Sequence, residues 1–210
     1  DGTYDITRAQ SHFSRALALD PTAHELTWYQ SGRIDFIRGN FDAALFKFDK
    51  QLEYFGERVP NVHYMIGLTN AYKARRTKDS NDWQRGADGF RRYLDFYPDS
   101  PWARTDIAWI YFAQGKFSAM QDYTRAGLQT HPHNPWLLNM HGLSLLNTGQ
   151  TASALKHFIR AHHHAAELTP LDWGRAYPGN NPADWPQGLE EFRDAIRKNV
   201  ALTEQALQDT

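Results

Sequence analysis

Ten histidines are the side chains in this sequence best suited to binding a metal ion or moving a proton near neutral pH. His162, His163 and His164 are consecutive, and His157 precedes them by about one helical turn. Neighbouring residues of a helix point about 100° apart, so three in a row cannot all face one ion. His157 and His164 share a face, but no carboxylate completes a site there, and no His-Glu-x-x-His motif occurs. We therefore expect no metal site, and only weak adventitious binding of nickel or zinc.

A basic segment is the second candidate, because Lys and Arg side chains bind phosphate. Lys73, Arg75, Arg76 and Lys78 lie close together near the end of a predicted helix, where the helix dipole favours cations. Acidic residues neutralise this charge locally, and the whole chain has a net charge of -1. They are Asp79, Asp82, Asp88 and Asp95. We predict that the protein binds no nucleic acid.

Catalytic motifs are missing from the sequence. It contains no Ser-His-Asp, P-loop, dinucleotide-binding or paired-carboxylate signature. It also contains no cysteine, which excludes disulfides, thiolate metal sites and cysteine catalysis. We expect a protein that is not an enzyme, with no catalytic residues and no cofactor.

The composition is that of a folded protein. The 210 residues are 41% hydrophobic, 22% charged and 14% aromatic. The longest apolar run, residues 107–113, is too short to cross a membrane, so we expect no membrane insertion. The sequence lacks the pattern of a signal peptide, a positively charged segment followed by an apolar stretch. These features predict a soluble protein of the cytoplasm or the cell envelope.

The elements that would position these side chains repeat every 34 residues. Small residues recur with small ones and aromatic residues mostly with aromatic ones, without a gap from residue 83 to residue 196. Three such series are Trp83, Phe117, Thr151 and Trp185; Phe90, Thr124, Phe158 and Phe192; and Gly86, Met120, Ala154 and Gly188. Several parallel series at one period indicate a repeat architecture rather than coincidence.

This pattern resembles the tetratricopeptide repeat (TPR), a helix-turn-helix unit of 34 residues. The clearest match is Trp28, Gly32, Gly39, Phe41, Ala44 and Phe48, and a second runs through Leu138, Gly142, Leu145, Gly149, Ala154, Phe158 and Ala161. Met120, Thr124 and His141 depart from the family pattern. The resemblance implies an all-α right-handed superhelix of antiparallel helix pairs. Glycines at the end of the first helices would supply left-handed caps.

One array of about four full repeats is expected over residues 1–210, with a half repeat at each end. The half repeat 5–19 is followed by repeats at 24–55, 61–97, 101–130 and 134–167, a short helix and loop at 168–185, and a terminal capping helix at 186–208. Gly39 and Gly115 are eight residues further apart than two repeats require. We place this excess in two loops, residues 56–60 and 75–82.

The segment 172–186 breaks the period, since Pro178–Pro182 cannot be helical. Two interpretations remain open. The segment folds over the end of the binding groove as a lid or plug, or it fills the space left by a shortened helix.

The resemblance also implies a concave groove lined by the first helix of each repeat. The positions that line it are unusually rich in aromatic residues, which dominate binding hot spots. The groove residues carried over are Tyr29, Arg33, Phe36, Tyr64, Tyr72, Trp102, Thr105, Trp109, Phe112, Trp136 and Asn139. The alternative is that some of these rings pack between helices. The Lys and Asn residues of the carboxylate clamp found in some family members are absent here.

Three functions remain open from the sequence. The first is a non-catalytic scaffold that binds a protein or an extended peptide in the aromatic groove. The second is a homo-oligomer that assembles through the exposed N-terminal half repeat. The third is a regulatory domain of a larger enzyme.

Overall fold

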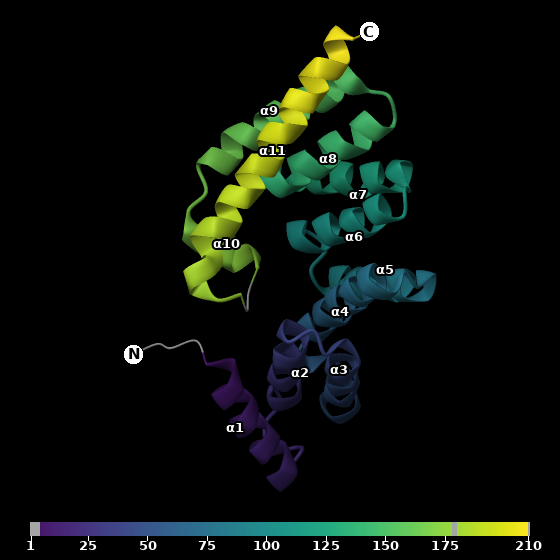
Figure 1. The fold of residues 1–210 in the computed structure, drawn as a ribbon. Coiled ribbons are helices and arrows are strands. Elements are labelled where there is room, and N and C mark those ends of the chain that lie inside the picture. Colours follow the sequence, from purple (N-terminus) through teal and green to yellow (C-terminus); the bar gives the residue numbers. More distant parts are fainter. Residues whose placement is uncertain (1–4, 178–179, 210) are drawn as a thin grey trace. The chain divides into compact units, whose positions relative to one another are not determined.

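The computed structural model describes residues 5–177 and 180–209. In these residues the chain forms helices and no strand, which confirms the all-α prediction (Figure 1). It divides into two compact units, one ending at Pro98 and the other beginning at Asp99, where the sequence predicts one array. None of the described helices is both long and apolar enough to cross a lipid bilayer.

The first unit begins with the single helix α1, which packs on α2. Two antiparallel pairs follow, α2 with α3 and α4 with α5, and the short 3-10 helix η1 connects them (Figure 1). The bounds are α1 Ile6–Leu19, α2 Thr27–Ile37, α3 Phe41–Phe55, η1 Gly56–Arg58, α4 Asn61–Thr77 and α5 Ser80–Phe96.

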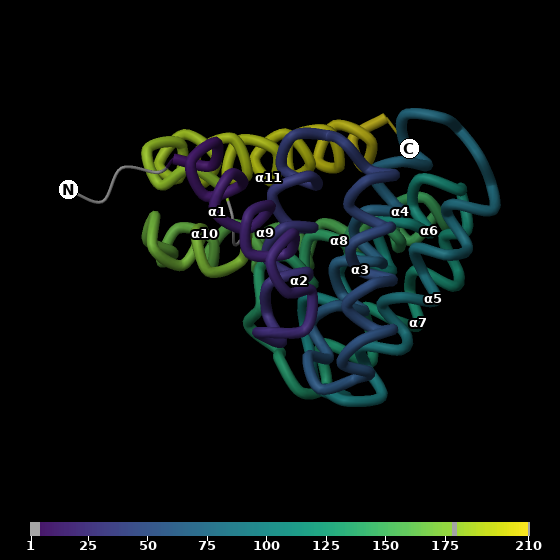
Figure 2. Tube along the Cα trace, turned by 90° about the horizontal axis from the view of Figure 1, so that it is seen from below, coloured from purple at the N-terminus to yellow at the C-terminus, as the bar shows by residue number. Residues whose placement is uncertain are grey.

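The second unit contains the pairs α6 with α7 and α8 with α9, then the short helix α10 and the long terminal helix α11. Figures 1 and 2 both show α11 alongside α9 and α10, and α11 packs on both of them. The bounds are α6 Pro101–Ala113, α7 Phe117–Thr130, α8 Pro135–Asn147, α9 Thr151–Ala166, α10 Pro170–Ala176, η2 Pro182–Asp184 and α11 Trp185–Gln208.

The helix ends follow from local chemistry. Ser100, Asn134 and Thr169 each accept a hydrogen bond from the backbone N–H three residues later, and each precedes a proline at the first helical position. At the other end of the first helices, Gly39, Gly115 and Gly149 all have positive φ angles of 69–78°. These are the left-handed caps that the sequence predicts.

The prediction of an inserted loop at 75–82 is wrong. Helix α4 continues to Thr77, Lys78 adopts a left-handed conformation at φ 64°, and Asp79 already caps α5. The Asp79 carboxylate accepts a hydrogen bond from the Asn81 N–H at 2.8 Å. The extra residues therefore lengthen both helices to 17 residues, because a two-residue link with a side-chain cap is enough to reverse the chain.

Close contact between the paired helices depends on glycine facing a ring. Phe48, Phe90 and Phe158 are fully buried, and each lies against a glycine of the first helix in its own pair. A Cβ atom at any of these glycines would lie within 2.9 Å of the ring. These glycines are Gly32, Gly67 and Gly142. The pair α6 with α7 departs from this rule, since the buried Thr124 replaces the ring.

Candidate functional site

The predicted groove residues of the first unit have different environments. Tyr29 is buried against Phe48, with ring centroids 6.2 Å apart, and this burial raises the pKa of the Tyr29 hydroxyl. The Arg33 guanidinium lies over the Tyr29 ring, 5.8 Å from its centroid. Tyr64 is half-buried and packs on two rings of α5, those of Phe90 and Tyr93. Tyr29 and Tyr64 therefore hold helices together.

Phe36 and Tyr72 form an accessible cluster on the same unit. Their ring centroids lie 5.4 Å apart in an edge-to-face arrangement, and Phe41 completes a group of three rings. The Arg76 guanidinium lies over the Phe41 ring at 5.1 Å. The Tyr72 side chain is 39% exposed. The structure thus brings a predicted groove residue of α2 and one of α4 into contact at the surface.

In the second unit, Trp136 and Asn139 are largely covered by the chain itself. Trp136 is 6% exposed, stacks on Phe192 of α11 at 5.1 Å, and donates a hydrogen bond from Nε1 to the Tyr177 hydroxyl at 3.1 Å. Asn139 accepts a hydrogen bond from the Asn199 amide at 2.9 Å. Both predicted groove residues therefore anchor the C-terminal helices.

The segment after α9 contributes to the same anchor. The Trp173 ring of α10 stacks on the Trp136 ring, with ring centroids 6.5 Å apart. The Tyr177 and Trp173 ring centroids are 4.2 Å apart. The Trp185 ring packs directly on Gly174. These contacts agree with the interpretation in which the segment fills the space beside a shortened helix. Pro178 and Gly179, part of the predicted loop, lie outside the described residues.

The remaining predicted residues of this unit follow one side of α6. Trp102, Thr105, Trp109 and Phe112 are spaced by three and four residues, which places them on a common helix face. Trp102, Thr105 and Trp109 are half-buried, and Phe112 is 38% exposed. We call these four residues the α6 face. The Trp102 ring of this face contacts Trp136 edge-to-face, with ring centroids 4.9 Å apart.

Two basic side chains of the first unit, Lys73 and Arg92, are paired with acids of other helices. Lys73 lies 2.7 Å from the Asp42 carboxylate, and Arg92 forms a bidentate pair with Glu57. Hydrogen bonding to Arg92 lowers the pKa of the Glu57 carboxyl. Asp42 and Glu57 come from other helices, so sequence spacing alone did not identify them as partners.

His141, one of the departures from the family pattern, is buried on α8. Its Nδ1 lies 2.8 Å from the Thr124 hydroxyl, and its ring meets His157 edge-to-face at 4.7 Å. Burial, with smaller effects from the charges of His157 and Arg125, lowers the pKa of His141 to about 4. The native state therefore holds this imidazole neutral at physiological pH.

The depressed pKa of His141 predicts a loss of stability in acid. The unfolded chain binds a proton at His141 below about pH 6.5 and the folded chain does not, so the free energy of unfolding falls between pH 6.5 and 4. Allowing for solvent screening, we expect a loss of roughly 2 kcal/mol. Urea unfolding of the native chain and of His141→Leu at both pH values measures it. Identical pH profiles for the two proteins would contradict the prediction.

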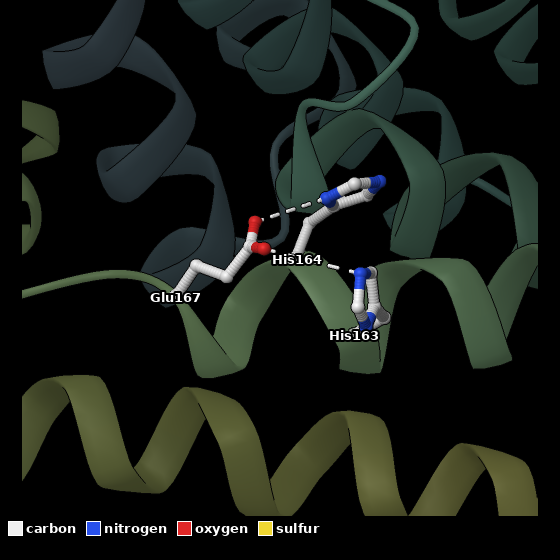
Figure 3. Close-up of side chains that lie close together, drawn as sticks. All are labelled: His163, His164 and Glu167. Atoms are coloured by element: carbon white, nitrogen blue, oxygen red, sulfur yellow. Dashed lines mark hydrogen bonds and ion pairs between the residues drawn. The ribbon is translucent and has the colours of Figure 1, made fainter.

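A cluster of His163, His164 and Glu167 lies at the end of α9 (Figure 3). The two Glu167 oxygens face one imidazole nitrogen each, at 3.3 Å from His164 Nδ1 and 3.9 Å from His163 Nε2. The sequence predicts no carboxylate that completes a site with His157 and His164, whereas the structure places Glu167 beside His164. Glu167 follows His164 and His163 by three and four residues, a helical spacing that was visible in the sequence.

No family model matches the sequence, and no curated protein matches it. Solved structures are similar in fold. MamA superposes with a TM-score of 0.67 at 16% identity, covering 78% of this chain and 90% of that one. YrrB, described as a TPR protein with an unusual peptide-binding site, gives 0.60 at 17% identity, covering 76% and 77%. A thermophilic TPR protein of Thermus thermophilus gives 0.59 at 14% identity, covering 89% and 90%.

The local features agree with these likenesses. Antiparallel helix pairs, left-handed glycine caps and buried rings facing glycines recur along the chain. At these identities the similarity establishes the fold, and the chain has the fold of a tetratricopeptide-repeat protein.

Proposed function

We propose that this protein is a non-catalytic scaffold that binds an extended peptide segment of another protein through aromatic side chains of its first helices. The observation that carries the proposal is the exposure of these rings. Tyr72 and Phe112 keep 39% and 38% of their surface accessible, although large aromatic side chains are normally used to fill cores.

The α6 face supports the proposal because its rings are aligned along one helix. Rings spaced by three and four residues lie along one face of the helix, and the Thr105 hydroxyl among them donates a hydrogen bond to the Pro101 carbonyl. Aromatic residues bury a large area at low entropic cost, which suits a peptide ligand. YrrB, whose fold is similar, is described as having a peptide-binding site. Only the general class of ligand, a peptide, is carried over from YrrB to this chain.

A peptide selected from a random display library against the whole chain provides the test. Combined replacement of Trp109 and Phe112 by alanine should weaken binding of that peptide at least 30-fold, about the 2 kcal/mol of a hot spot. Fluorescence anisotropy measures the affinity, and circular dichroism checks that the helices remain. Phe46→Ala is the matched control, since this ring is 55% exposed on the second helix α3. Equal losses in both variants, or none in either, would move the site off the first helices.

Self-assembly through α1 is a second candidate function. No residue of α1 is buried, although Phe13 and Leu17 lie on one side of it and Leu19 is 79% exposed. The contacts of α1 with α2 are polar in part, since Arg38 donates to Thr7 and Gln10 donates to Asp35. Sedimentation velocity at several protein concentrations distinguishes the two candidates. A monomer throughout would exclude self-assembly and leave peptide binding unaffected.

A further inference from the structure

We propose that His163, His164 and Glu167 form a binding site for one divalent transition-metal ion of the zinc class. All three offer ligand atoms that lie within 4.8 Å of one another. In a tetrahedral zinc site the ligand atoms lie about 3.3 Å apart, as metal–ligand distances of 2.0–2.2 Å require. His164 Nδ1 and Glu167 already lie 3.3 Å apart, and His163 Nε2 lies 3.9 Å from the other Glu167 oxygen. Closing the 3.9 Å separation requires the side chains of His163 and Glu167 to rotate, and both are largely exposed.

The ligand types select the class of ion. Two imidazoles and one carboxylate suit zinc, nickel or copper, whereas magnesium and calcium prefer oxygen ligands alone. Three protein ligands leave a fourth position for water. The position faces solvent, because the side chains of His163 and Glu167 are 71% and 65% exposed.

His133 acts as a positioning residue from the loop between α7 and α8. Its Nδ1 lies 3.1 Å from His164 Nε2, the nitrogen that does not face Glu167. A carboxylate only accepts hydrogen bonds, so His164 Nδ1 carries a proton in the metal-free arrangement. A neutral imidazole carries one proton, so an ion bound at Nδ1 would leave the His164 proton on Nε2, where it would donate to Nδ1 of a His133 that carries its own proton on Nε2. A metal-bound histidine is normally held in this way by a partner on its other nitrogen.

The backbone around the cluster is fixed by two arginines. Arg160 of α9 donates a hydrogen bond to the carbonyl of Pro132 at 2.8 Å, which attaches the His133 loop to α9. Arg193 of α11 donates to the carbonyls of Ala165, Ala166 and Leu168 at 2.8–3.1 Å. The loop and the end of α9 therefore bring the four side chains together before any ion binds.

His162 provides a matched control inside the same histidine run. It lines a different surface, a cavity of about 280 Å³ with Glu190, Arg193 and Arg197 of α11. It has the same chemistry as its neighbours and is exposed like His163, but it lies outside the proposed ligand set. Scattered histidine binding would involve it as much as the others.

Titration of the whole chain with Zn²⁺, by calorimetry and by competition with a chromophoric chelator, tests the site. We expect one equivalent to bind. His163→Gln, His164→Gln and Glu167→Gln should each lower the affinity at least as much as losing an outer partner, about 10- to 100-fold. His162→Gln should leave it unchanged. The proposal would be overturned if His162→Gln weakened Zn²⁺ binding as much as the ligand replacements do. It would also be overturned if none of the three ligand replacements changed the affinity. Circular dichroism checks that each variant folds.

The role of His133 needs a separate pair of variants. His133→Ala should weaken Zn²⁺ binding about 10-fold by releasing His164, and His133→Asn should restore part of the affinity because its amide oxygen can accept the same hydrogen bond. An unchanged affinity in His133→Ala would remove His133 from the site. Mg²⁺ in excess should not compete with Zn²⁺ in the native chain.

Discussion

Replacing Trp136 by alanine should destabilise the second unit by about 3–5 kcal/mol, the usual cost of removing a large buried ring. Trp136 is 6% exposed and joins α8 to both C-terminal helices through Phe192, Trp173 and the Tyr177 hydroxyl. Its loss leaves a cavity where three rings meet. Urea unfolding gives the free energy, and hydrogen exchange of α10 and α11 should show the largest increase.

Ile159→Ala is the control for this prediction. Ile159 lies on α9 of the same unit, but it is 49% exposed, so its replacement should change the free energy of unfolding by only about 0.5 kcal/mol. If Trp136→Ala were as stable as this control, Trp136 would not anchor the C-terminal helices. It would then return to the set of residues available to a ligand.

Gly89→Ala should cost about 3 kcal/mol or more in the first unit, the upper range of overpacking. A Cβ atom at Gly89 would lie 2.6 Å from the Gly67 backbone nitrogen, 2.8 Å from the Gly67 Cα and 2.9 Å from the His63 carbonyl oxygen. These atoms belong to the backbone of α4, so α4 and α5 must separate to admit the methyl group. The helix preference for alanine, about 1 kcal/mol, is too small to offset this.

Two comparisons isolate the cause. At Gly32 the three atoms nearest to the new methyl group belong to the Phe48 ring and not to a backbone, so Gly32→Ala should cost less than Gly89→Ala. Gln84→Ala, an exposed change on α5, should be nearly neutral. Thermal and urea unfolding measure all three. A Gly89→Ala protein as stable as Gln84→Ala would show that the two helices are not in backbone contact.

The pairing of helices could be predicted because its causes are local. A helix repeats its environment every three to four residues, and its ends are set by a few side chains nearby. Gly39, Gly115 and Gly149 identified three such ends correctly. The prediction failed between α4 and α5, where Lys78 adopts the left-handed conformation in place of a glycine. Lysine rarely adopts the left-handed conformation, so its presence at position 78 does not predict a helix end there.

The candidate sites were predicted less completely, because a residue's exposure depends on what packs over it. Trp102 and Trp136 occupy equivalent positions after equivalent Pro residues, yet only Trp136 is buried, because α10 and α11 follow it. His133 and His164 lie 31 residues apart and meet only because a loop docks on α9.

The sequence by itself determined the helical hairpins of this protein, their caps and the supply of rings along their first helices, since each depends on residues within a turn or two. Only the tertiary structure decided which rings remain accessible and which histidines meet a carboxylate and each other. Those outcomes depend on contacts between helices distant in sequence, whose crossing geometry is set by buried glycines and rings acting together.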